Sequence, residues 1–417
     1  MRRRFLHAAD LHIDSPLLGL SAYEGAPVEA ARLAPRAAFS NLISIAIERN
    51  VAFLLLSGDI TDGDNNQIST GLFIASELRR ATEAGILVFI LWGNHDADAA
   101  LFKKLPMPVG VRIFSSRKPE QEVLDHLGVS ITGQSYGQRA VMDNLAIGYP
   151  EAPNKAGLLN IAMLHTSLTG RDGHDPYAPC TEADLHSRGM HYWALGHPHT
   201  REVVSRNPWI VIPGNLQGRS VRETGTRGAH LVTYDESGIT DTEWIDCSVM
   251  HWEVLSIDVG GCEVMPDLLE AIRKSLVSAA IAADGRTVAA RIILNGETEL
   301  HPELIHRPGD LRSQILALAA GDGGRVWIEK VKIDTVRPAT HAPNGSALGA
   351  LEHILGSAEF DAELIAAIGT DLKGITAQLP REVVNNSDLL KEVAAENWTA
   401  LTLRAAPELR GLIEKGN

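Results

Sequence analysis

The chain has 417 residues, of which 45% are hydrophobic and 22% are charged. This length predicts two or three domains, and this composition is that of a folded globular protein and excludes an intrinsically disordered chain. The formal net charge of −14 argues mildly against nucleic acid as a partner, because lysine and arginine carry most of the binding to phosphate.

The N-terminal segment and the cysteines bear on where the protein works. The first ten residues include three arginines but reach His7 and Asp10 without the apolar stretch of ~7–15 residues that a secretion signal needs. We therefore expect a first strand there. No uncharged stretch approaches the ~20 residues that span a bilayer. The three cysteines are scattered singly, which does not suit a disulfide framework. We expect a cytoplasmic protein with no membrane partner.

Short apolar runs that end abruptly in polar clusters dominate the first 250 residues. They are residues 5–9, 53–56, 86–91, 161–164 and 192–195. Between several of them lie segments with apolar residues at helical spacing, such as 37–49 and 70–84. This alternation of strand and helix patterns predicts an α/β domain.

The pattern changes after His199. Strand patterns without intervening helices, at 209–212, 230–234 and 240–245, predict consecutive antiparallel pairing and a second sheet. From about residue 250, strand patterns at 251–259, 288–295 and 326–334 alternate with helical stretches at 265–282 and 310–320. Residues 338–346 are rich in Pro, Ala, Asn, Gly and Ser, as linkers are, and precede an amphipathic helical tail. We therefore expect domains at 1–250 and 251–337, followed by a linker and helical region at 338–417.

The polar clusters that follow the five runs carry the chemistry. They are Asp10-x-His12, Gly58-Asp59-x-x-Asp62, Gly93-Asn94-His95-Asp96, His165 and Gly196-His197-x-His199. Ligands bind at the carboxyl ends of strands in open α/β sheets, so these clusters should converge. Together they offer oxygen and imidazole donors without a thiolate, a set that suits Mn²⁺, Fe²⁺ or Zn²⁺, and they are enough for two ions.

A pair of ions points to phosphoester chemistry. Two metals ~3.5–4 Å apart can bind a phosphate, activate a water and stabilise the developing charge. Asp59 is the best candidate for a bridging carboxylate, and Asn94 offers a neutral carbonyl oxygen as a ligand. Any one of these motifs alone is more often structural than metal-binding; the case depends on all five occurring in order.

In this order the motifs resemble the calcineurin-like metallophosphoesterases. The opening AADLHIDSPL, the GNHD block and PGN at 213–215 are similar to the SbcD/YhaO-type DNA-repair exonucleases. The resemblance is carried by motifs over about 1–245 and by size and order alone over 251–337. It implies a metallophosphoesterase β-sandwich flanked by helices, with a small α+β capping domain and a helical C-terminal tail.

The resemblance also implies a role for each motif residue. One metal would be held by Asp10, His12, Asp59 and His199, and the other by Asp59, Asn94, His165 and His197. Mn²⁺ is the expected ion, with Fe²⁺ or Zn²⁺ as alternatives.

His95 would stay uncoordinated and would stabilise or protonate the leaving oxygen, a role that imidazole suits near neutral pH. Asp96 would orient it. A purely structural turn residue is the alternative for His95. Asp62 stands where many relatives have a histidine, so a second substrate-contacting imidazole is missing, and we assign the Asp62 carboxylate to the substrate-binding residues.

Local basic residues bear on whether the substrate is DNA. Arg219, Arg222 and Arg227 follow PGN in a glycine-rich loop, where Arg219 and Arg222 could contact backbone phosphates; a solvated surface is the alternative. A dinuclear site supplies about four positive charges of its own. The net charge therefore does not exclude DNA, but it predicts weak, salt-sensitive binding by this chain alone.

The sequence thus predicts a two-metal-dependent phosphodiesterase, a DNA-repair exonuclease or endonuclease that uses a metal-activated water. Two alternatives stay open: a small-molecule phosphodiesterase or phosphomonoesterase acting on nucleotide-type substrates, and a catalytically silent DNA-bound scaffold. The resemblance implies DNA and an SMC-like coiled-coil ATPase (SbcC/YhaN-type) as partners, and we also expect a homodimer. The tail at 347–417 could bind the ATPase or pack on its own domain.

Overall fold

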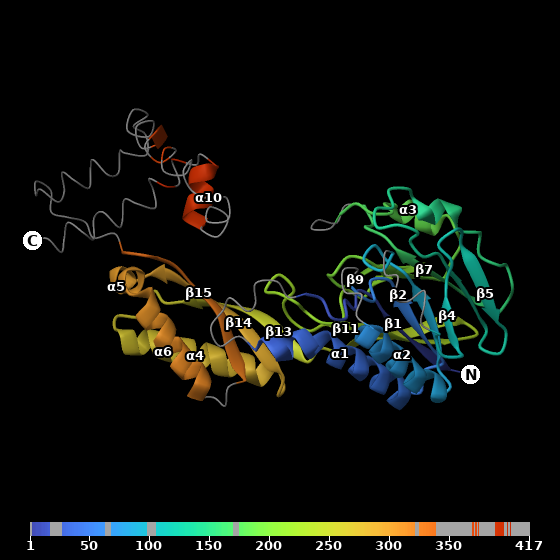
Figure 1. Cartoon of the computed structure of the whole chain (residues 1–417), viewed down its shortest axis with the longest axis horizontal. Coiled ribbons are helices and arrows are strands. Elements are labelled where there is room, and N and C mark those ends of the chain that lie inside the picture. Colours follow the sequence, from blue (N-terminus) through green and yellow to red (C-terminus); the bar gives the residue numbers. More distant parts are fainter. Residues whose placement is uncertain are drawn as a thin grey trace, which may run out of the picture. The chain divides into compact units, whose positions relative to one another are not determined.

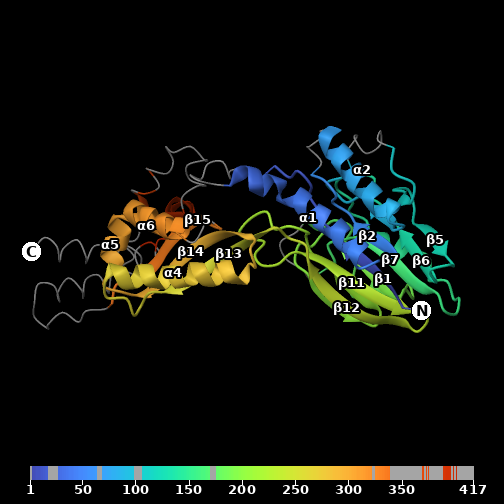
Figure 2. The same cartoon turned by 90° about the horizontal axis from the view of Figure 1, so that it is seen from below.

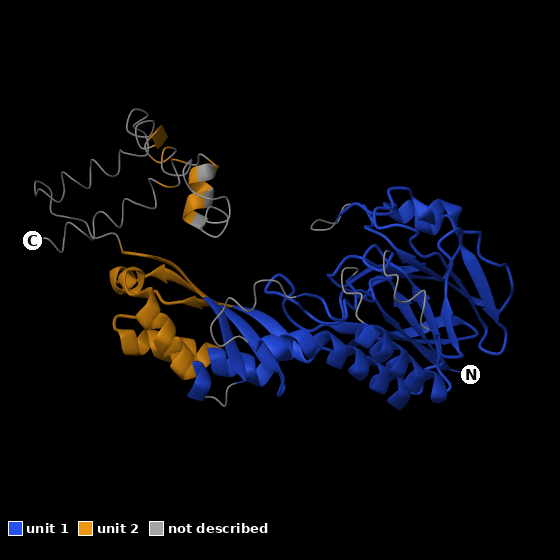
Figure 3. Cartoon of the chain, viewed as in Figure 1, with its two compact units in different colours: residues 1–254, 276–291, 319–330 blue, residues 255–275, 292–318, 331–417 orange. Residues whose placement is uncertain are grey.

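The structure, a computed structural model, describes residues 2–16, 27–62, 68–97, 106–169, 175–321 and 325–338, with short pieces between 369 and 401. The chain forms two compact units (Figure 3). Unit 1 comprises residues 1–254, 276–291 and 319–330, and unit 2 comprises residues 255–275, 292–318 and 331–417. The domain boundaries expected at 250 and 337 stay a prediction. Most of the predicted linker and tail lies outside the described residues, and α10 (Asp388–Ala394) is a helix described there.

Two six-stranded sheets form the body of unit 1. In spatial order the first sheet holds β12 (Gly238–Asp246), β11 (Gly228–Asp235), β1 (Arg3–Ala8), β2 (Phe53–Ser57), β3 (Leu87–Leu91) and β4 (Val111–Ile113). The second holds β5 (Glu120–Leu124), β6 (Val129–Gly133), β7 (Leu159–His165), β8 (Tyr192–Gly196), β10 (Trp209–Ile212) and β9 (Glu202–Arg206). Strands β1 to β4 are parallel, as are β6, β7, β8 and β10. In the first sheet, antiparallel strands β11 and β12 flank the parallel part on one side, and β4 is a parallel strand at the other edge. In the second sheet, both edge strands, β5 and β9, pair antiparallel.

Apolar side chains fill the space between the sheets. Phe5 of β1 stacks on Phe53 of β2 with ring centroids 4.9 Å apart, and the Tyr192 ring of β8 meets Phe5 edge-on. The strands read as unbroken apolar runs because a parallel strand covered on both faces has no solvent side. His7 is one of the buried polar residues in the strands; its ring bonds the Tyr192 hydroxyl and the Leu195 carbonyl, each at 3.0 Å, and so joins the two sheets.

Helices cover the outer faces of the sandwich (Figures 1 and 2). On the first sheet, α1 (Val28–Glu48) and α2 (Ile68–Glu83) pack their buried apolar residues against the strands. On the second, α3 (Glu182–His186) and the 3₁₀ helix η2 (Leu145–Gly148) do the same. The predicted β-sandwich flanked by helices is therefore confirmed.

One predicted strand pairing is wrong. Strands β10 and β11 were expected to pair with each other, but β10 joins β8 and β9 in the second sheet, whereas β11 joins β1 and β12 in the first. The β10–β11 loop, residues 213–227, crosses from one sheet to the other. Strand β10 is short and almost fully buried, and such an apolar run carries no signal for which sheet it joins.

A three-stranded sheet follows the sandwich along the chain. Its strands, in spatial order, are β13 (Met250–Asp258), β14 (Thr287–Glu297) and β15 (Val326–Val336), and its helices are α4 (Met265–Ala282), α5 (His301–His306) and α6 (Pro308–Gly321). Hydrogen bonds join the starts of β14 and β15 (Val288 to Arg325) and their ends (Thr298 to Val336), so these strands are parallel. No described helix is long and apolar enough to cross a membrane.

Candidate metal centre

The metal-binding motifs leave their strands through unusual backbone turns. Asp10, His12, Asp59 and His197 have φ angles of 52°, 44°, 51° and 98°, in the left-handed region that non-glycine residues rarely enter. Backbone hydrogen bonds hold the first two motifs together, because the Asp10 and His12 N–H groups donate to the carbonyls of Gly58 and Asp59 at 3.0 Å. These turns bring side chains from strand ends of both sheets to one place.

Three glycines let the motif loops approach one another closely. A Cβ atom at Gly58 would overlap the His165 ring, one at Gly93 would overlap Asp59, and one at Gly196 would overlap the Ser57 carbonyl. Gly58 also has a φ of 94°, which favours glycine for its own sake. The glycine that precedes the ligand in three of the five motifs is therefore a packing requirement of the centre.

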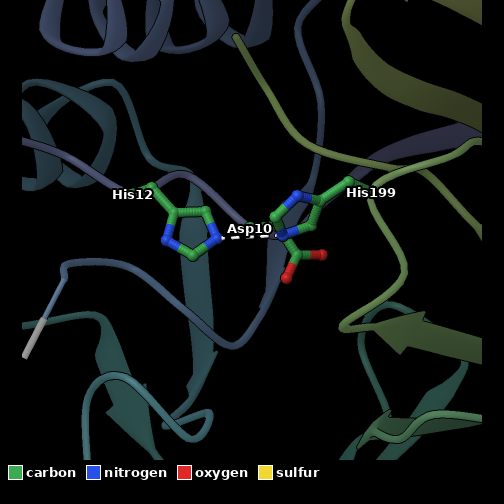
Figure 4. Close-up of side chains that lie close together, drawn as sticks. All are labelled: Asp10, His12 and His199. Carbon is green, nitrogen blue, oxygen red and sulfur yellow. Dashed lines mark hydrogen bonds between the residues drawn. The ribbon is translucent and has the colours of Figure 1, made fainter. Parts of the chain in front are cut away.

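Asp10, His12 and His199 form one group of potential ligands, here called site A. One ligand atom from each lies within 4.8 Å of the others, and the two imidazole Nε2 atoms are 3.1 Å apart. Figure 4 shows the Asp10 carboxylate beside the two rings, with the imidazole nitrogens facing each other. The His197 backbone N–H donates to both oxygens of Asp10, at 3.0 and 3.2 Å, and so fixes the carboxylate.

Asp59, His165 and His197 form another group, site B, and His12, Asp62 and His95 form a third. The Asn94 carbonyl oxygen lies 3.0 Å from His165 Nε2 and completes site B. Asp59 Oδ2 lies 3.5 Å from His165 Nε2 and 3.9 Å from His12 Nε2, so one carboxylate oxygen faces both sites. The structure thus brings all seven predicted metal ligands together and places Asp59 between the two sites.

The hydrogen bonds of the four imidazoles indicate which nitrogen of each neutral ring carries the proton. Each ring has one nitrogen beside a group that can only accept: Asp62 for His12, Glu223 for His199, the Ser57 carbonyl for His165 and the Asp175 carbonyl for His197. In the neutral form of each ring that nitrogen carries the proton, and the other one holds a lone pair. Two lone pairs then face each other across 3.1 Å in site A, an arrangement that a cation stabilises. The residues therefore fit a pair of divalent ions.

The charges of the centre favour bound cations. Burial opposes ionisation of Asp59, but the neighbouring imidazoles of His165 and His12 outweigh it and lower the Asp59 pKa. Burial also opposes protonation of His165, yet its pKa rises to about 9, chiefly because it faces Asp59. Burial raises the pKa of Asp10 to about 6. The buried carboxylates thus stabilise positive charge at the positions where ions would bind.

His95 lies beside the two sites without belonging to the predicted ligand set. Its side chain is 31% exposed, and its Nδ1 lies 3.0 Å from Asp62 Oδ1. Burial would lower the pKa of His95, but the bond to Asp62 and the charge of Asp59 raise it. The contact with Asp62 thus favours the protonated form of His95, and part of the side chain is exposed.

The predicted partner of His95 has to be corrected. Asp96 accepts hydrogen bonds from the backbone N–H groups of Ile60, Thr61 and Gly93 at 2.8 to 3.1 Å, so its carboxylate ties two motif loops together. Asp62 is the residue that orients His95. It does so while it also accepts from His12 at 2.7 Å, so the carboxylate assigned to substrate binding is engaged with the centre itself. The motif spacing gives no information on which of two nearby aspartates faces the ring.

The β10–β11 loop contributes a residue that the sequence analysis missed. Glu223 Oε1 accepts from His199 Nδ1 at 2.7 Å and from Arg219 at 3.3 Å. Arg219 also lies 3.6 Å from Asp62, so this predicted substrate-binding residue is at the centre. Arg222 is exposed, and no described contact joins its side chain to the metal-binding groups. Arg227 donates to the His199 carbonyl at 2.6 Å. Glu223 stood within the loop already singled out, but no strand-end motif marks it.

Comparisons with known proteins agree with this geometry. The calcineurin-like phosphoesterase family matches residues 3–201, and the family of the middle domain of metallophosphoesterase YhaO matches residues 252–336. An uncharacterized metallophosphoesterase YhaO of Bacillus subtilis is 36% identical over 296 residues, which cover 70% of this chain and 71% of the relative. The chain belongs to the YhaO family of calcineurin-like metallophosphoesterases. As a family member with a His/Asp dimetal site, it is a metal-dependent phosphoesterase.

One more distant relative and one solved structure also match. The DNA double-strand break repair protein Mre11 of Sulfurisphaera tokodaii is 26% identical over 285 residues, which cover 66% of this chain and 68% of that protein. A dimetal phosphatase structure from Danio rerio aligns with a TM-score of 0.35 and 11% identity, over 55% of this chain and 92% of that one. The YhaO family member described here is thus distantly similar to a protein named for DNA repair.

Proposed function

We propose that this YhaO-family protein hydrolyses phosphodiester bonds of DNA, as a repair exonuclease that uses Mn²⁺. The observation that carries the proposal is His95, a half-open imidazole held by Asp62 beside the two metal positions. DNA cleavage releases a sugar oxygen, which is a poor leaving group unless it is protonated, and a protonated imidazole supplies that proton. The similarity to Mre11 supports DNA as the substrate.

The ions, when bound, would polarise the scissile phosphate and activate a water. The chain's own residues do the rest. Asp62 holds Nδ1 of His95, so that Nε2 is the nitrogen that can face the leaving oxygen and donate its proton. Asp96 keeps the Asp59 and Asn94 loops in register through its backbone hydrogen bonds. Arg219, held between Asp62 and Glu223, places a positive charge near the phosphate.

The acidic chain fits DNA binding that depends on a partner. A net charge of −14 leaves the two ions and a few arginines to attract phosphate, so binding by the protein alone should be weak and salt-sensitive. We therefore propose that an SMC-like coiled-coil ATPase and a second copy of the chain complete the DNA-binding surface. Mixing the protein with a coiled-coil ATPase of this class and measuring DNA affinity against salt would test this.

The direct test is hydrolysis by the purified protein with Mn²⁺. The substrates are linear duplex DNA, single-stranded DNA and bis-p-nitrophenyl phosphate, each with and without EDTA. Asp59→Asn serves as the inactive variant and His126→Ala, which changes an exposed histidine, as the matched control. We expect EDTA-sensitive degradation of DNA by the wild type and the control.

The outcomes separate the competing functions. Cleavage of the small ester with DNA left intact, even when the ATPase is added, would replace the nuclease by a small-molecule phosphoesterase. Tight DNA binding without cleavage of any substrate in the presence of two bound ions would indicate a DNA-bound scaffold.

A further inference from the structure

The two metal sites differ in the groups that accept hydrogen bonds from their histidines. In site A, both imidazoles donate to carboxylates, His12 to Asp62 and His199 to Glu223, each at 2.7 Å. In site B, both imidazoles donate to backbone carbonyls, those of Ser57 at 2.9 Å and Asp175 at 2.8 Å. When one nitrogen of a metal-binding histidine donates to a carboxylate, its other nitrogen is a stronger electron donor to the metal than when the acceptor is a neutral carbonyl.

The formal charges around the two sites also differ. Site A has Asp10 among its own ligands, and two further carboxylates accept hydrogen bonds from its imidazoles; Arg219 and the His95 ring lie beside these carboxylates as counter-charges. The additional oxygen ligand of site B is Asn94, which is a neutral amide. Asp59 groups with site B and lies nearer to it, 3.5 Å from His165 Nε2 and 3.9 Å from His12 Nε2, so each site has one carboxylate of its own. The advantage of site A therefore depends on the carboxylates that accept hydrogen bonds from His12 and His199, which the neutral carbonyls of site B do not match.

Four hydrogen bonds fix the orientation of the Glu223 carboxylate. Oε1 accepts from His199 and from the Arg219 guanidinium, while Oε2 accepts from the Arg219 backbone N–H at 2.8 Å and from Asn215 Nδ2 at 2.9 Å. The His199 carbonyl accepts from Arg227 at 2.6 Å. Both the ring and the backbone of His199 are thus held by the β10–β11 loop.

We infer that the two ions bind in order, site A first and more tightly, and that Glu223 is the positioning residue that gives site A this advantage. The inference concerns the metal centre alone and holds whatever the substrate is. Glu223 acts through His199 and does not touch the ion. Its loss should weaken the first binding step and leave the second nearly unchanged.

The test is a titration of the metal-free protein with Mn²⁺. Calorimetry measures the affinity of each step, and electron paramagnetic resonance monitors the bound ions. For the wild type we expect two steps, with the spectrum of an isolated ion after one equivalent and a spin-coupled pair after two. Glu223→Gln keeps the size of the side chain but removes its charge, and it should weaken the first step about 10- to 100-fold. Glu48→Gln, the same substitution at an exposed position, should change neither step.

Two ligand variants identify which site is filled first. His197→Ala should keep the tight step and lose the weak one, whereas His199→Ala should lose the tight step. Melting of each metal-free variant, checked by circular dichroism, shows whether it is folded. If Glu223→Gln does not fold, Asp62→Asn tests the other backing carboxylate by the same titration. An unchanged first step in a folded Glu223→Gln, or loss of the tight step in His197→Ala, would overturn the inference.

Discussion

Replacement of His95 by alanine tests whether this imidazole acts as a general acid. The side chain touches Asp62 but is not needed for site A or site B, so the variant should bind two Mn²⁺ ions as the wild type does. General-acid catalysis contributes about 10²–10⁴ in rate, which corresponds to about 3–5 kcal/mol of transition-state stabilisation. We expect a loss of this size on DNA.

The leaving group makes the experiment specific. The sugar oxygen of DNA needs a proton as it leaves, whereas p-nitrophenolate leaves readily as an anion. His95→Ala should therefore lose much less activity on bis-p-nitrophenyl phosphate than on DNA. The assay is kcat on each substrate at saturating Mn²⁺, with metal content measured on the same samples and His126→Ala as the control.

Two results would contradict the assigned role. An equal loss on both substrates would show that His95 binds the phosphate or orders the centre and does not donate a proton. A loss of metal in parallel with activity would show that His95 is a ligand. This alternative is considered because His95 contacts Asp62 and lies close to His12.

Three further changes have expected outcomes. Asp59→Asn should lower metal content as well as activity, because this carboxylate faces both sites; elemental analysis after gel filtration measures it. Gly93→Ala should also lower the metal content, since its methyl group would overlap Asp59, and normal Mn²⁺ affinity in this variant would refute the packing argument. Burial and His230 lower the pKa of His7 to about 3, whereas an unfolded chain takes up that proton below about pH 6.5. The free energy of unfolding should therefore fall by about 1.4 kcal/mol per pH unit from 6.5 toward 3, and His7→Gln, studied by denaturant titration without metal, should remove this part of the acid sensitivity.

The sequence predicted the parts of the centre that follow strands. Asp10, Asp59, Asn94 and His165 each come directly after a buried apolar run, and strand ends in parallel sheets converge for geometric reasons. The helices α4 and α6 were also predicted nearly to their ends, because an apolar stripe at helical spacing is a local signal.

What could not be predicted depends on contacts between distant segments. Glu223 accepts a hydrogen bond from His199, but it lies in a loop in which only the glycines and arginines suggested a function. That Asp62 and not Asp96 contacts His95 depends on which carboxylate accepts from the backbone N–H groups of Ile60 and Thr61, and these groups come from another loop than Asp96. Strands β10 and β11 lie in different sheets because the β10–β11 loop crosses the sandwich. The apolar pattern of a strand does not predict which sheet the strand joins.

The left-handed backbone at Asp10, His12, Asp59 and His197 sets a balance between stability and function. Each such residue costs about 1–3 kcal/mol, and glycine would adopt the same turns without that cost. Glycine in place of one of these ligands should relieve that strain, but it should also yield a metal-poor protein and remove the hydrogen bonds of the ligand side chain. Each ligand is thus held in a backbone conformation that its own residue type disfavours.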